Sequence, residues 1–114
     1  MNSSYAFIAD LSQQIPEIPA DSIVSRTLHS DDDVKVVLFG FAPGQELSEH
    51  TAAVPALLCF VQGEANLTLG EDTLVAKAGA WAHMPPHLPH SIVAKTPVVM
   101  LLLMFKSTAM PKST

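Results

Sequence analysis

The chain has 114 residues, the usual size of one domain, and can bury one hydrophobic core. Its 11 acidic residues against six lysines and arginines give a net charge of -5, which argues against a nucleic-acid partner, because such binding requires clustered cations. The longest apolar run, residues 98–105, is far shorter than the roughly 20 residues that span a bilayer, so we expect no association with a membrane.

The first residues and the single cysteine bear on where the protein works. Residues 1–5 lack the basic and long apolar regions of a secretory signal. Cys59 lies in an apolar run and has no second cysteine with which to form an internal disulfide. We therefore expect a cytoplasmic protein in which Cys59 is a small buried side chain rather than a nucleophile.

In chain order, the pattern is one of short strands separated by proline and glycine turns. Only residues 10–15 can begin a helical turn, which Asp10 or Ser12 would cap and Pro16 would end. Residues 31–33 are three aspartates without the alternating spacing of a calcium loop, so we expect a solvated turn there. Strands are then expected over residues 34–41, 57–61, 65–69, 73–76, 81–84, 91–94 and 98–105. This spacing predicts a single-domain, all-β antiparallel sandwich or barrel.

Two histidines stand out because each lies in a segment that glycine and proline punctuate. His50 and His90 are separated by a strand-rich stretch of suitable length for the two halves of one barrel. The residues that form the two spaced patterns are Gly44, His50, Gly63, Gly79, Pro85 and His90. Together these patterns predict a barrel with a central pocket framed by two imidazoles.

The two patterns resemble the motifs of the cupin family, G-x5-H-x-H-x3-4-E-x6-G followed by G-x5-P-x-G-x2-H-x3-N. The resemblance runs from about residue 24 to residue 105 and is similar to that of short, single-domain bacterial cupins. It implies an RmlC-like double-stranded β-helix, which is an antiparallel jelly-roll barrel. Residues 1–23 would then form an arm or strand that packs on the barrel of residues 24–105, and residues 106–114 would form a polar tail.

Four positions depart from the cupin pattern. They replace a histidine, a glutamate, a glycine and an asparagine, and they are Ala52, Ala56, His87 and Ala94. A typical cupin holds a divalent ion with three histidines and one glutamate, so the resemblance implies a site for Fe, Mn, Ni or Zn at His50 and His90. Two imidazoles with water hold such an ion only weakly.

The remaining histidines differ in what they offer to such a site. His87 is the candidate third metal ligand, because the proline-stiffened segment 87–90 could place two imidazoles on one rim; the alternative is a residue of a surface turn. His83 has the same strand parity as Trp81, and we expect it to pack beside that ring. His29 precedes the acidic turn, where we expect it to be exposed, and it is assigned no role.

Strand alternation selects the residues that would line the pocket. Ser48 and Ala52 share the face of His50, whereas Glu49 points the other way. On the next strand, the inward residues are expected to be Ala56, Leu58, Phe60 and Gln62.

Two functions follow from this pocket, and the sequence does not decide between them. In the first, the protein is a metal-dependent enzyme in which His50 and His90 hold the ion and the pocket admits a small organic molecule. In the second, the protein is a metal-free binding or sensing barrel, in which alanines enlarge an apolar cavity and the histidines donate hydrogen bonds to a small polar group. The sequence names no reaction and no catalytic residue.

The strand at residues 57–61 is apolar on both faces. Leu57, Cys59 and Val61 alternate with Leu58 and Phe60, and the barrel interior covers only one of these two sets. We therefore expect a homodimer, which the resemblance to small cupins also implies.

Overall fold

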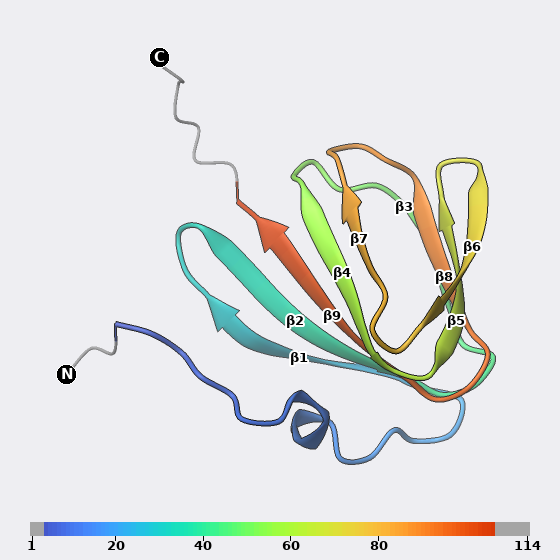
Figure 1. The fold of residues 1–114 in the computed structure, drawn as a ribbon, viewed down its shortest axis with the longest axis horizontal. Coiled ribbons are helices and arrows are strands. Elements are labelled where there is room, and N and C mark those ends of the chain that lie inside the picture. The colour runs from blue at the N-terminus through green and yellow to red at the C-terminus, as the bar shows by residue number, and fades with distance from the viewer. Residues whose placement is uncertain (1–3, 107–114) are drawn as a thin grey trace.

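The computed structural model describes residues 4–106, and nine strands in this range form two antiparallel sheets that face each other (Figure 1). The five-stranded sheet has the order β1-β2-β9-β4-β7, and the four-stranded sheet has the order β3-β8-β5-β6. The strands are β1 (Ile23–Ser30), β2 (Val34–Phe41), β3 (Glu46–His50), β4 (Ala56–Gln62), β5 (Glu64–Leu69), β6 (Asp72–Lys77), β7 (Trp81–Met84), β8 (His90–Ala94) and β9 (Val98–Phe105). The all-β antiparallel barrel expected from the sequence is confirmed.

The main core lies between the two sheets. Alternate residues of β4 are buried there, and Leu58 is only 1% exposed. The buried members of this core cluster are Phe41, Ala56, Leu58, Phe60, Ala65, Leu67, Ala76, Met84, Ile92, Ala94, Val98 and Met100. Period-two alternation in strands places these side chains on one face, so the sandwich closes around them.

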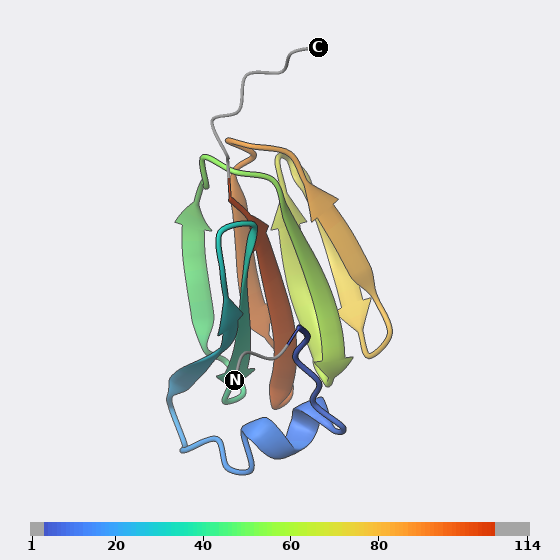
Figure 2. The ribbon, with the colours of Figure 1, turned by 90° about the vertical axis from the view of Figure 1, so that its left-hand side faces the viewer.

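A second, smaller core lies on the outer face of the five-stranded sheet, where the N-terminal arm packs (Figure 2). Ile15 and Ile18 of the arm contact this face beside Gly40 of β2, and a Cβ atom at Gly40 would lie 2.9 Å from Ile18 Cγ1 and 3.0 Å from Ile15 Cγ2. Because glycine has no side chain, the arm can approach the strand closely at this point. Both faces of β2 are thereby covered.

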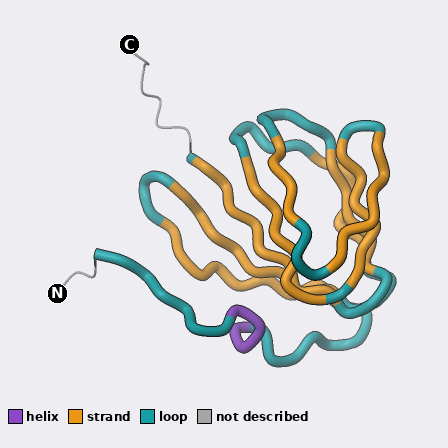
Figure 3. The backbone as a smooth tube through the Cα atoms, in the orientation of Figure 1, coloured by secondary structure: helices purple, strands orange, loops and turns teal. Residues whose placement is uncertain are grey.

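The arm also contains the one helical segment of residues 4–106, a 3-10 helix at Leu11–Gln14 (Figure 3). Asp10 caps it as expected, because its Oδ1 accepts a hydrogen bond from the Ser12 backbone N–H at 3.1 Å. No helix in the described range is long and apolar enough to cross a membrane.

The acidic turn between β1 and β2 is an ordered, hydrogen-bonded turn, as the lack of calcium-loop spacing predicted. Asp31 Oδ1 accepts from the backbone N–H groups of Asp33 and Val34 at 2.8 and 2.9 Å, and Asp31 Oδ2 pairs with His29 Nε2 at 2.7 Å. These bonds, with that from His29 the strongest, lower the pKa of Asp31 to about 2. His29 is half-buried rather than exposed, and its ring is held by this pairing. Lys106 donates to Ser30 Oγ at 3.1 Å, which attaches the end of β9 to this turn, and the rest of the expected tail lies outside the described residues.

Cys59 differs from its expected full burial. It is a half-buried free cysteine that pairs with Leu101 and Trp81 across the five-stranded sheet. Paired residues of neighbouring strands share a face, so Cys59 belongs to the outer face, of which the arm covers only a part.

Candidate functional site

His50 and His90 lie directly opposite each other on two neighbouring strands of the four-stranded sheet. His50 ends β3, His90 begins β8, and the two are register partners. Their ring centroids are 4.1 Å apart, with an angle of 58° between the ring planes. His90 is 6% exposed, whereas His50 is open to solvent. One ring of the pair is therefore buried and the other is exposed, at one end of the four-stranded sheet.

A β-bulge in β3 places His50 in this position. Leu47 pairs with Ile92 and His50 pairs with His90, so three residues of β3 span the length of two residues of β8. Ile92 belongs to the main core, and Leu47 packs against it. The bulge brings Leu47 and His50 to the same face despite their odd separation, and the strict alternation that assigned Ser48 to the face of His50 does not hold here. Ser48 is exposed.

Each of the two imidazoles is held by a bond to its own strand. His50 Nδ1 lies 2.9 Å from the carbonyl oxygen of Ser48, and His90 Nδ1 lies 2.9 Å from the carbonyl oxygen of Leu88. A carbonyl oxygen can only accept, so Nδ1 is the donor in both rings. In the neutral imidazole this leaves Nε2 with its lone pair, as in histidines that bind metals through Nε2 while a backbone carbonyl orients the ring.

The structure brings together two of the three histidines considered as metal ligands. Among residues 4–106, no three side chains of His, Cys, Asp or Glu lie close enough to hold one metal ion, so His87 does not join the pair. His87 is exposed and has a φ of 68° in the turn before β8. His83 lies elsewhere, exposed on β7 opposite Leu57 of the five-stranded sheet.

The other residues selected by alternation fall into three groups. Ala56, Leu58 and Phe60 are buried in the main core, where neighbouring side chains pack against them. Ala52 is half-buried, and its carbonyl oxygen accepts from His87 N–H at 2.7 Å. Gln62 is exposed and lies beyond a second bulge, where it pairs with Val99 of the outer core cluster. The alternation that assigned Gln62 to the inward face therefore ends at Phe60.

The sequence patterns around these histidines match an established family. The family model for the cupin domain matches residues 37–105, which include both histidines and most of the strands. The chain belongs to the cupin family. A comparison with curated protein sequences finds no match.

Solved structures of several other proteins have the same architecture. A cupin superfamily protein from Desulfitobacterium hafniense has a TM-score of 0.80 and 28% identity, over 85% of this chain and 88% of that one. A conserved protein of unknown function from Streptococcus pyogenes also has a TM-score of 0.80, with 29% identity over 99% of this chain and 95% of its own. A cupin 2 conserved barrel domain protein from Leptotrichia buccalis has a TM-score of 0.75 and 27% identity, over 82% of this chain and 46% of that one.

Sequence patterns missed two features that the fold creates. The bonds from Nδ1 to the backbone in His50 and His90 depend on ring orientation, which no motif encodes. The pairing of His29 with Asp31 has a sequence signal, since the two residues flank the start of a turn with one residue between them.

Proposed function

We propose that this cupin binds a divalent transition metal ion weakly through His50 and His90, and that a small organic molecule binds at the ion's remaining positions. The observation that supports this proposal is the pair of imidazoles whose centroids are 4.1 Å apart and whose Nδ1 atoms both face a backbone carbonyl. Metal–nitrogen bonds are about 2.0–2.1 Å long, so one ion shared by two Nε2 atoms requires two rings about as close as these.

The donor set decides how tightly such an ion would be held. Two neutral imidazoles suit Fe, Mn, Ni or Zn, but catalytic sites of this kind usually have three protein ligands. Only two are grouped here within residues 4–106, so a bound ion would exchange readily and would keep positions open to solvent. When bound, the ion would act as a Lewis acid toward an oxygen atom of the organic ligand. His90, which is nearly buried, would fix the ion's depth, and exposed His50 would border the entrance.

The alternative is a metal-free binding or sensing site at the same pair. The observation that favours it is the replacement of ligand positions by Ala52 and Ala56, which leaves the imidazoles without a third ligand among residues 4–106. Because Nδ1 of each ring already donates to a carbonyl oxygen, Nε2 of each neutral ring would accept a hydrogen bond from a hydroxyl or amine of the ligand, rather than donate one as the sequence suggested. Both proposed functions use His50 and His90, and they differ in whether ligand binding requires a metal ion.

Calorimetric titration with Zn²⁺ and Ni²⁺ tests the proposal on protein purified without a histidine tag. We expect one weak site per chain, with the affinity reduced at least about tenfold in His50→Ala and in His90→Ala, since even residues that only orient ligands contribute about 10–100-fold. His83→Ala is the matched control, because His83 is an exposed histidine on the other sheet. Equal affinity in the His50 variant and the control would refute metal binding at the pair.

A further inference from the structure

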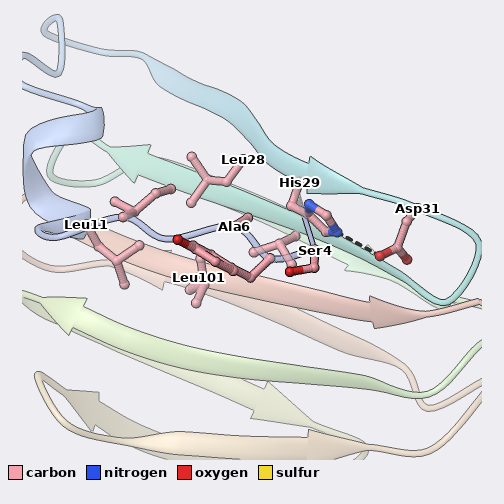
Figure 4. A pocket seen from close by; sticks show the side chains of 10 residues that line it. Ser4, Ala6, Leu11, Leu28, His29, Asp31 and Leu101 are labelled. Carbon is pink, nitrogen blue, oxygen red and sulfur yellow. Dashed lines mark hydrogen bonds and ion pairs between the residues drawn. The ribbon is translucent and has the colours of Figure 1, made fainter. Parts of the chain in front are cut away.

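A cavity lies under the N-terminal arm, on the face of the five-stranded sheet that is turned away from the main core (Figure 4). Its volume is about 790 Å³, which falls within the range of small-molecule sites. The arm forms one wall and the outer face of the five-stranded sheet forms the other. The lining residues are Ser4, Tyr5, Ala6, Ile8 and Leu11 from the arm, and Leu28, His29, Asp31, Val36 and Leu101 from the sheet and its turn.

The cavity is polar at one end and apolar along the rest. In Figure 4, Ser4 and His29 lie toward the end of the cavity at Asp31, and Leu11 lies at the opposite end beyond Leu28. The sheet residues contribute an aliphatic floor, because β-strand alternation directs Leu28, Val36 and Leu101 to the outer face. A ligand that fits both ends has an apolar body and one polar head.

The charged groups at the polar end offer hydrogen-bond acceptors to a ligand. Asp31 Oδ2 accepts a hydrogen bond from His29 Nε2 at 2.7 Å, and in the neutral form of the ring this leaves Nδ1 as an acceptor. The ionised Asp31 carboxylate and its exposed neighbours Asp32 and Asp33 add negative charge. Lys106 is a nearby cation within residues 4–106, and its ammonium is already bonded to Ser30 Oγ and to the Asp31 carbonyl oxygen. An anionic head would be repelled, whereas a hydroxyl or ammonium head would find acceptors.

We propose that this cavity is a ligand site, separate from the histidine pair, for a small molecule with an apolar ring or chain and a hydrogen-bond-donating hydroxyl or ammonium head. The head lies at Ser4, His29 and Asp31, and the apolar body lies over Leu28, Val36 and Leu101. Half of the lining residues belong to the chain's own arm, so the walls are in place without a macromolecular partner. The site does not depend on the function proposed for His50 and His90.

Three probes that differ only in their heads test this site by NMR. Backbone amide shifts of the full chain are followed during titration with 2-phenylethylamine, 2-phenylethanol and 3-phenylpropanoate. We expect saturable shifts at residues lining the cavity for the amine and the alcohol, and at least tenfold weaker binding of the carboxylate. The absence of saturable shifts for all three probes, or equal binding of the carboxylate, would overturn the proposal.

Variants locate the binding within the cavity. Ala6→Trp fills the space from the arm, which lies outside the barrel, and should abolish the shifts while the barrel resonances stay unchanged. Asp31→Asn should weaken the amine more than the alcohol, because it removes charge and retains a hydrogen-bonding side chain. His50→Ala is the control for independence and should leave all three affinities unchanged. Retention of binding in Ala6→Trp would place the probes elsewhere and refute the site.

Discussion

Backbone conformation explains several residues of the cupin motifs in this chain. Gly44, Gly63 and Gly79 all have positive φ, a conformation that side chains with a Cβ rarely adopt. His87, which stands where the second motif has a glycine, also has a positive φ of 68°. The backbone of the motif is therefore kept although the residue has changed, and His87 occupies a strained turn position rather than a ligand position.

Gly63→Ala should destabilise the protein more than Gly79→Ala. Both glycines have positive φ, at 87° and 96°, so both substitutions introduce backbone strain of about 1–3 kcal/mol. At Gly63 the new Cβ would also lie 2.0 Å from the Pro97 carbonyl oxygen, whereas nothing lies within 4 Å at Gly79. Urea unfolding of the two variants measures the difference. Equal losses of unfolding free energy would contradict the close approach of Pro97.

Asp31 should make the stability of the protein depend on pH in acid. Because its folded pKa is lowered from 3.8 to about 2, the ionised carboxylate stabilises the folded state. This contribution is complete above pH 3.8 and is lost as the pH falls toward about 2. The unfolding midpoint in urea should therefore fall more steeply over this range in the native protein than in Asp31→Asn. Identical slopes would show that the turn does not hold the carboxylate.

At the scale of elements, the packing of the N-terminal arm on the five-stranded sheet depends on the glycine at position 40, which has no side chain. Gly40→Val should displace the arm, because even a Cβ atom there would approach Ile18 and Ile15 within 2.9–3.0 Å. Overpacking of this kind costs about 1–3 kcal/mol. Thermal unfolding should show a lower Tm, and the amides of residues 10–18 should exchange faster with solvent while the main core stays protected. Unchanged exchange in the arm would contradict its docking at Gly40.

Element prediction from sequence succeeded where strands are apolar and failed where they are polar. Seven of the nine strands were expected close to their observed bounds, and β2, β7 and β9 match the expected bounds. The strand β1 was not expected, and β3 was treated as a strand around His50 without bounds, because both carry mostly half-buried or exposed residues and lack the apolar alternation that marks a strand. The histidines of the candidate site were found from their spacing. Ser48 and Gln62 were assigned to the inward face by strand alternation. Two bulges interrupt that alternation, and no sequence signal revealed the bulges.

For the whole molecule, the remaining outer face of the five-stranded sheet supports our proposal of a homodimer. Leu57 and Cys59 share this face with Leu103 and Trp81, and Trp81 is 66% exposed. Light scattering after size exclusion should give the mass of two chains, and Trp81→Glu should shift it toward one, since a buried unpaired charge is unfavourable. Val75→Glu, at an exposed apolar residue of β6 in the other sheet, should leave the mass unchanged. A single-chain mass for the native protein would contradict the proposal.

The most direct test of the account is the protonation of the histidine rings, measured by long-range ¹H–¹⁵N NMR correlation before and after addition of Zn²⁺. The account predicts that neutral His50 and His90 both carry the proton on Nδ1, where each faces a carbonyl oxygen, and that Zn²⁺ shifts the Nε2 resonances of these two rings while His83 stays unchanged. Protons on Nε2 in either ring, or a response to Zn²⁺ at His83 alone, would contradict it.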